Sequence, residues 1–278
     1  MKAAEFINDL PFIPKTLDDR WMRELQVLEA VIGNSFLPVV WCPIASSVGA
    51  HQVKIWVADD ALRIGEPDDY VRVSTTARTA QLICDHLDAR MLTPKIVDLV
   101  WLQAAVRIEP QYQSASVKNG TMDYSSVMRK HSVDVDRAIA GRTGLIADVG
   151  KHWVICSALV KHLGMAANYG WHTEHSKPDP AHPENGPYHA PCGGYMWQTL
   201  GMAHNAGTEG KDPGHQDYSQ VIRLACRVAE VDGARVPLDD VLTSKELAPA
   251  IHYEGALPFT RYPGVPLQPP EGPLEDPA

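Results

Sequence analysis

The chain lacks a cysteine framework. Its five cysteines are odd in number and widely spaced along 278 residues, and no CxxC pair occurs. This usage argues against a fold stapled by disulfides and against a structural zinc ribbon. Cys84, Cys156 and Cys226 lie in apolar runs, so we expect them to be buried as small hydrophobic side chains.

Long apolar runs and basic runs are also missing. No stretch approaches the roughly 18–20 apolar residues of a membrane helix, and the N-terminal MKAAEFINDLPFIPK does not have the form of a secretory signal. The net charge is −9 and no segment is rich in arginine, so nucleic acid is not an expected partner. We therefore expect a protein without membrane or nucleic-acid partners, located in the cytoplasm or released without a signal peptide.

The common catalytic motifs are absent as well. The sequence has no GxxxxGK[ST], no GxGxxG after a strand, no HExxH and no GxSxG. It therefore carries no local signature of a phosphate-binding loop, a dinucleotide-binding turn, a zinc protease helix or a nucleophile elbow. Any active site has to be inferred from residues that are spread along the chain.

Four stretches have the spacing and end signals of helices. Residues 17–32 carry apolar side chains at helical spacing, with carboxylates near the start that complement the helix dipole. Thr75 or Thr76, and Thr93 before a proline, provide caps for two more helices. Residues 126–141 form the fourth candidate. Three of the four lie within residues 1–110.

Strands are predicted from short apolar runs that are rich in β-branched residues. Residues 53–64 are expected to form two strands around a turn at Asp59-Asp60. Residues 70–74 and 166–172 are further candidate strands, and residues 221–233 open like a strand. Residues 151–160 are expected to contain a buried strand or a short helix, and the β-branched pair Val154 and Ile155 favours the strand. This order of elements favours an α+β fold with a mixed sheet and N-terminal helices, and an α/β fold is the alternative.

Residues 173–214 are rich in Pro, Gly and His and almost free of aliphatic side chains. Loops of this length are uncommon inside a domain and are usually functional, so we predict a long irregular loop that serves as a lid. Residues 1–110 are then an N-terminal α+β part. Residues 125–262 are a β-rich part that carries the site and packs with the first part as one unit. The Pro-rich tail, 263–278, is predicted to be extended or disordered.

Histidines are concentrated in the second half of the chain. Twelve are present, and eight of them fall between residues 152 and 215. Histidine is the usual acid/base group near neutral pH and a frequent metal ligand. Most of the eight are expected to be bystanders, but His172 follows a predicted strand, where its side chain could be presented at the strand end.

The stretch 214-GHQDYSQVIRL-224 supplies the partners for such a site. In an extended segment His215, Asp217 and Ser219 share one side, and Tyr218 points the other way, toward a core or a second site. Asp217 is expected to orient His172 as the acid/base partner, with His215 nearby and Ser219 as nucleophile or support. A hydrogen-bonded loop that only precedes a core strand is the alternative.

A metal site is the second mechanism that these residues allow. His172, His204, His215 and Asp217 could hold a divalent metal such as Zn²⁺, which would activate a water molecule. No spaced ligand motif stands out, so the form without a cofactor is favoured.

Four residues are predicted to bind substrate: Arg223, Tyr218, Trp197 and Lys151. Arg223 lies between apolar neighbours, so its charge should be paired with a carboxylate, Asp148 or Asp217, or with an anionic ligand. Trp197 could line an apolar groove, although such a residue more often belongs to a core. Lys151 precedes a buried run and could be presented at its start.

Three motifs resemble a family of uncharacterised bacterial sequences. MLTPKIVDLVW (91–101) is similar to that family's LPTPKMVDAIW, YGWH (169–172) occurs in both, and DYSQVIRL (217–224) resembles DYSHGIRL. The likeness spans most of the chain, up to about residue 262, and favours Asp217, Tyr218, Ser219, Arg223 and His172 as positions of interest. This chain has Gln220 and Val221 where the family has His-Gly. If that histidine were catalytic, His215 or His204 would have to replace it here.

The family's SHGIRL also resembles the SHGCIRL of L,D-transpeptidases, which act on bacterial cell walls through a cysteine nucleophile. Our chain has neither the His-Gly nor the Cys at those places, and the role of that cysteine is not carried over to Cys226. The resemblance implies a cell-wall peptide or another polar polymer as substrate.

Two functional classes follow from these observations. The favoured one is a hydrolase-like enzyme that acts on a polar polymer, or a small molecule, through a His/Asp-centred site. The alternative is a non-catalytic binding or assembly protein, in which the long loop and the Pro-rich tail contact partners.

Overall fold

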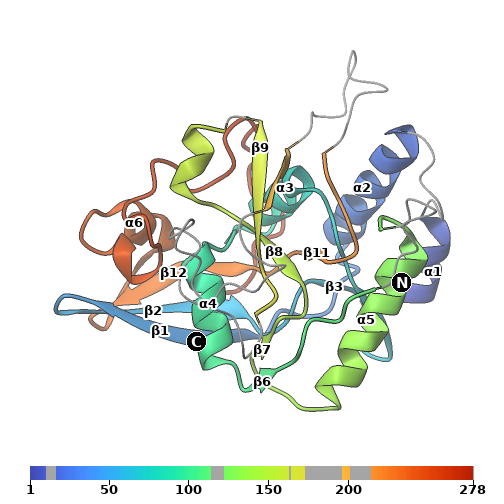
Figure 1. Ribbon diagram of the computed structural model, residues 1–278, viewed down its shortest axis with the longest axis horizontal. Helices are drawn as coiled ribbons and strands as arrows, with labels where there is room; N and C mark the ends of the chain where they lie inside the picture. Colours follow the sequence, from blue (N-terminus) through green and yellow to red (C-terminus); the bar gives the residue numbers. More distant parts are fainter. Residues whose placement is uncertain (11–16, 114–121, 163, 173–195, 201–213, 278) are drawn as a thin grey trace.

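The computed structural model describes residues 1–10, 17–113, 122–162, 164–172, 196–200 and 214–277. Within these residues the chain is α+β, because it combines α-helices with small sheets whose strands pair mostly antiparallel (Figure 1). The α/β alternative is thereby set aside. No helix in the described part is long and apolar enough to cross a membrane.

The helices begin where their cap residues predict. Thr76 accepts a hydrogen bond from Thr79 N at the start of one helix, and Thr93 accepts one from Ile96 N at the start of the next. A threonine at this position satisfies an otherwise unpaired N–H group of the first turn. The α-helices are α1 (Ala3–Asp9), α2 (Leu17–Ile32), α3 (Ala77–His86), α4 (Pro94–Gln103), α5 (Ser125–Ile139) and α6 (Leu238–Thr243).

The largest sheet lies at one end of the molecule and has the order β1-β2-β12-β13, with β5 paired to β12 (Figure 1). Its pairings are antiparallel throughout. α6 and a short 3₁₀-helix, η4 (Ala248–Ala250), contact this sheet. Its strands are β1 (Trp41–Val48), β2 (His51–Ala58), β5 (Ala89–Arg90), β12 (Ala225–Val231) and β13 (Ala234–Pro237).

A second sheet, with the order β10-β9-β8-β11, crosses the centre of the molecule. β8 pairs antiparallel with β9 and parallel with β11, so this sheet is mixed, as predicted. β10 lies inside the segment predicted to be irregular, which is therefore not a continuous loop. The strands are β8 (Lys151–Val154), β9 (Met165–Gly170), β10 (Met196–Thr199) and β11 (Gln220–Val221), and η2 (Ser157–Val160) follows β8.

The two strands predicted around Asp59-Asp60 are both present, but they do not pair with each other. β2 pairs with β1, whereas β3 (Arg63–Glu66) pairs with β4 (Asp69–Arg72) in a sheet of its own. Asp60 turns inward and binds Arg72, so the chain changes sheets at this point instead of folding back. A further small pair joins β6 (Val106–Arg107) to β7 (Ile146–Ala147).

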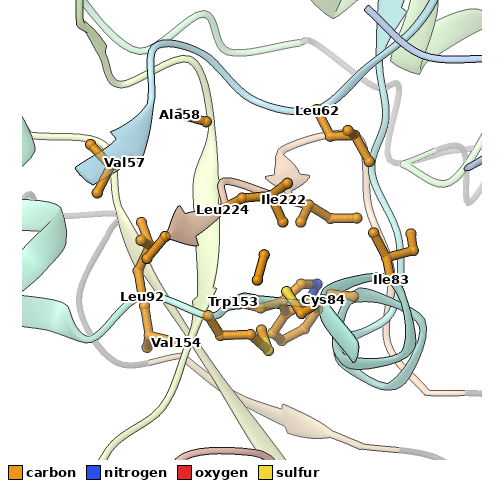
Figure 2. Packing of buried hydrophobic residues seen from close by; sticks show 14 of the residues in the cluster. Val57, Ala58, Leu62, Ile83, Cys84, Leu92, Trp153, Val154, Ile222 and Leu224 are labelled. Carbon is orange, nitrogen blue, oxygen red and sulfur yellow. The ribbon is translucent and has the colours of Figure 1, made fainter. Parts of the chain in front are cut away.

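One large core draws on both predicted parts of the chain. Figure 2 shows Val57 of β2, Ile83 of α3, Trp153 of β8 and Ile222 packed in the same cluster. Trp153 is anchored there, because its indole N–H donates to Thr75 O at 2.8 Å. This core holds the central sheet in a fixed relation to the helices and so positions the edge described below.

The Pro-rich tail is extended and packs against the body of the protein. Trp41 Nε1 donates to Glu275 O at 2.9 Å, and the N–H groups of Gly272 and Leu274 donate to carbonyls at the end of α3. Asp276 pairs with Arg227 of β12. These contacts offset the entropy that would otherwise keep such a segment unfolded.

Candidate functional site

The residues of interest meet at one edge of the central sheet. Lys151, the first residue of β8, lies opposite both Gly170 of β9 and Gln220 of β11. His172 therefore lies just beyond the end of β9, and Asp217 just before the start of β11 (Figure 1). The sheet thus brings together two motifs that are far apart in the sequence.

Asp217 is the centre of a compact polar group. Its Oδ1 accepts hydrogen bonds from Ser219 N at 2.7 Å and from the Ser219 hydroxyl. Its Oδ2 lies 3.6 Å from His215 Nε2 and 3.9 Å from Lys151 Nζ. The Asp217–Ser219 contact is a local turn in which an aspartate side chain caps the backbone two residues later. The structure thus brings His215, Asp217 and Ser219 together through a turn at residues 218–219, and not through the extended segment that the sequence predicted.

The environment of Asp217 keeps its carboxylate ionised. Burial by itself would raise the pKa, but the His215 ring, the charge of Lys151 and the two Ser219 bonds outweigh it. The net effect lowers the pKa of Asp217 to about 2. His215 remains partly exposed, with 38% of its side chain accessible, so a buried charge faces a reachable imidazole.

This environment predicts how the stability of an Asp217→Asn variant depends on pH. A carboxyl whose pKa falls from 3.8 to about 2 on folding adds about 2 kcal/mol of stability above pH 4. That contribution is lost as the pH falls through the folded pKa. Urea unfolding at pH 6 should therefore show the wild type more stable than the variant, and the difference should shrink by pH 3. A difference that stays constant between these two pH values would contradict the assignment.

His172 has other partners than the predicted Asp217. Its Nδ1 lies 2.9 Å from Asp148 Oδ1 and its Nε2 lies 2.7 Å from Asp98 Oδ1. The ring is 1% exposed and stacks on Trp101 at 5.3 Å. Both nitrogens are engaged, so neither is positioned to take a proton from a substrate.

Two carboxylates convert His172 into a buried cation. Burial alone would lower its pKa, but Asp148 and Asp98 raise it to about 9. The Asp98 side chain also accepts hydrogen bonds from Tyr169 (2.9 Å) and Tyr253. This group of side chains joins α4, the loop before β8, the end of β9 and the C-terminal region. It holds these four segments together, and we refer to this group of side chains as the brace.

The backbone next to this brace is strained. Asp148 and Trp171 have φ values of 62° and 63°, a left-handed conformation that bulky side chains rarely adopt. The Trp171 N–H donates to Asp148 Oδ1 at 3.1 Å, the same oxygen that faces His172. Such strain persists only where surrounding contacts fix it, and here the His172 pairing is one of those contacts.

Asp98 was not identified from the sequence as a site residue, and Asp148 was considered only as a partner of Arg223. A signal for both was present, because each is a lone carboxylate among apolar residues, in KIVDLVW and LIADVG. A carboxylate that is carried into a core needs a partner. The sequence could not show that both aspartates share a single histidine.

The substrate-binding predictions have mixed outcomes. Arg223 is buried and donates to the carbonyls of Ala58 (2.6 Å) and Ile146 (2.5 Å), so the predicted hydrogen-bonded pairing with Asp148 or Asp217 is replaced by a bridge between backbone segments. Tyr218 is 2% exposed and points toward the core, against Trp171. The Lys151 ammonium lies 5.2 Å from the centre of the Trp171 ring.

For two of the predicted residues the structure describes no side chain. Trp197 belongs to β10, but the position of its side chain is not among the described features, and His204 lies outside the described residues altogether. In the described residues, no group of three or more His, Cys, Asp or Glu side chains is arranged to hold a metal ion. The zinc alternative therefore stays a prediction.

Arg23 extends the site to a distant helix. This buried side chain of α2 donates to Gln216 Oε1 at 2.5 Å and to Ser74 Oγ at 2.8 Å. Gln216 precedes Asp217, whose own N–H donates to Gln220 Oε1 at 3.0 Å. The segment that carries His215 and Asp217 is thus held from both sides, which fixes the geometry of the pair.

Comparison of the chain with protein-family models, with curated proteins and with solved structures found no match. The resemblances seen in the sequence therefore stay predictions, and the site has to be interpreted from its own geometry.

Proposed function

We propose that the chain is a hydrolase that acts on a polar polymer, a cell-wall peptide or glycan, with His215 as its acid/base group. The supporting observation is the 3.6 Å approach of the partly exposed His215 ring to the buried, ionised carboxylate of Asp217. General acid–base catalysis uses such a pair, and the hydrogen bond commonly tightens when substrate binds. The polymer as substrate is taken from the likeness to cell-wall transpeptidases.

In this mechanism Asp217 selects the tautomer of His215. The carboxylate faces Nε2, which carries the hydrogen, so the lone pair is on Nδ1. Nδ1 removes a proton from water while the water oxygen forms a bond to the substrate carbon. The proton then passes to the leaving nitrogen or oxygen as the scissile bond breaks, which restores the neutral imidazole.

Ser219 and Lys151 support Asp217 in this proposal. The Ser219 hydroxyl donates a hydrogen bond to the Asp217 carboxylate, so in this proposal Ser219 positions Asp217 and is not the nucleophile. The positive charge of Lys151 helps to keep Asp217 ionised. His172 has an indirect role in this proposal, because it holds the end of β9 in place through Asp98 and Asp148 and does not contact the substrate.

The proposal predicts a large loss of activity in a His215→Ala variant. Removal of a general base typically lowers the rate by 10²–10⁴-fold, so we expect a decrease of at least about 100-fold. Purified cell walls and defined peptides and glycans would be incubated with the protein, and mass spectrometry would identify the products. His162→Ala is the matched control, since His162 is exposed and outside the site.

Each other outcome has a clear meaning. Full activity in His215→Ala would contradict the assigned role. Absence of any product with every polymer would favour the non-catalytic binding alternative. Activity that is lost after treatment with a chelator and restored by zinc would favour the metal mechanism over the cofactor-free one.

A further inference from the structure

A polar pocket is built from residues that the proposed reaction does not use. It has a volume of about 330 Å³ and opens between the 59–63 turn, β4, the C-terminal end of α5 and residues 141–146. A volume of this size suits a small molecule. The pocket is lined by acidic and basic side chains, several of which pair with one another.

The floor of the pocket is a buried ion pair. Arg72 Nη2 donates to Asp60 Oδ2 at 2.6 Å, and Arg72 Nε donates to both carboxylate oxygens. Arg72 Nη1 also binds Asp136 Oδ1 at 2.7 Å. The charges of Arg72 and Asp60 satisfy each other, so they form a rigid base and leave recognition to the residues above them.

Two carboxylates on the wall retain capacity to accept hydrogen bonds. Asp59 receives one side-chain hydrogen bond, from Arg63 Nη2 at 3.3 Å, and Asp136 Oδ1 also receives one from Tyr70 OH at 2.8 Å. The two side chains are 17% and 40% exposed, and a carboxylate has about four lone-pair sites. The C-terminal end of α5 adds a partial negative charge. This side of the pocket therefore suits an ammonium group.

Two guanidinium groups retain capacity to donate. Arg63 makes the Asp59 bond and an ion pair with Asp60 at 3.7 Å. Arg142 donates to Ile139 O at 2.8 Å and to Ala138 O at 2.7 Å. A guanidinium has five N–H groups, so both keep donors for an added acceptor. Arg63 and Arg142 are therefore suited to bind a carboxylate.

We propose that this pocket binds a short zwitterionic peptide or amino acid, with its ammonium on Asp59 and Asp136 and its carboxylate on Arg63 and Arg142. The lining has three aspartates and three arginines, so its formal charge is zero. A ligand of one sign would be repelled by the residues that carry the same charge, whereas a zwitterion complements both sets. This inference is independent of the proposed hydrolase activity.

The test is a titration calorimetry series with the full-length protein. L-alanyl-L-alanine, its N-acetyl derivative and its C-terminal amide differ in one charge each. We expect saturable binding of the dipeptide, and binding at least about tenfold weaker for each derivative, because each loses a charge-assisted hydrogen bond. Equal binding of the N-acetyl form would indicate an anion site, and equal binding of the amide a cation site. Either of these results, or no saturable binding of the dipeptide, would overturn the proposal.

Two variants assign the charges to residues. In Asp59→Asn the preference for the dipeptide over its N-acetyl derivative should become smaller, since the ammonium keeps only Asp136 as its partner. In Arg63→Gln the preference for the dipeptide over its amide should become smaller in the same way, since the carboxylate keeps only Arg142. Asp68→Asn is the control, because this carboxylate is 73% exposed and outside the pocket. Thermal unfolding would show whether each variant is folded, and the series on the wild type decides the question if one is not.

Discussion

Replacing His172 with glutamine should lower the free energy of unfolding by about 3–5 kcal/mol at pH 7. The His172 ring is 1% exposed and bridges Asp98 and Asp148. Glutamine removes the positive charge and leaves two buried carboxylates without compensation. Removing one member of a buried ion network destabilises a protein by more than the intact network stabilises it, because the remaining charges stay desolvated.

The dependence of stability on pH separates this explanation from a simple packing defect. The pKa of His172 rises from 6.5 to about 9 on folding, which corresponds to about 3 kcal/mol. A raised pKa adds stability that is complete below pH 6.5 and is lost as the pH rises through 9. The difference between the wild type and His172→Gln should therefore decrease between pH 7 and pH 10.

Urea unfolding followed by tryptophan fluorescence would measure both effects. His162→Gln is the matched control, because that side chain is exposed and its replacement should change stability by about 0.5 kcal/mol or less. A loss below about 1 kcal/mol in His172→Gln, or a loss that does not depend on pH, would show that the brace is not a charged network.

Replacing Asp60 with asparagine should cost a similar amount, about 3–5 kcal/mol. Asp60 is 1% exposed and forms a bidentate pair with Arg72, which is equally buried. Burial would raise the pKa of Asp60, but the charge and hydrogen bonds of Arg72 outweigh it and lower the pKa. The asparagine variant keeps the shape of the side chain but leaves the guanidinium with Asp136 as its only carboxylate partner in the described part of the chain.

Denaturant unfolding of Asp60→Asn beside Asp68→Asn would test this expectation. Asp68 pairs with Lys2 at the surface at 3.6 Å, and exposed pairs of this kind contribute little. Comparable losses in the two variants would mean that the buried pair does not hold the turn between β2 and β3. A large loss in Asp60→Asn alone would confirm that this pair stabilises the fold at the turn between β2 and β3.

The helices were predictable because their signals are local. Thr76 and Thr93 cap α3 and α4 through contacts with residues three positions later, and such contacts depend only on the nearby chain. β8 and β9 were predicted from their apolar runs for the same reason. The register and partners of the strands were not, since residues that alternate along one strand do not specify which other strand it joins. The two strands on either side of Asp59-Asp60, for example, are both present but belong to different sheets.

The candidate site shows the same difference between local contacts, which were predictable, and long-range contacts, which were not. The group of His215, Asp217 and Ser219 was predictable, because these residues lie within five positions and one local turn joins them. The pairing of His172 with Asp98 and Asp148 was not, because these aspartates are 74 and 24 positions away and reach the histidine only in the folded protein. A buried charge takes the partner that the folded core places beside it, and that placement depends on how α4, β8 and β9 pack together.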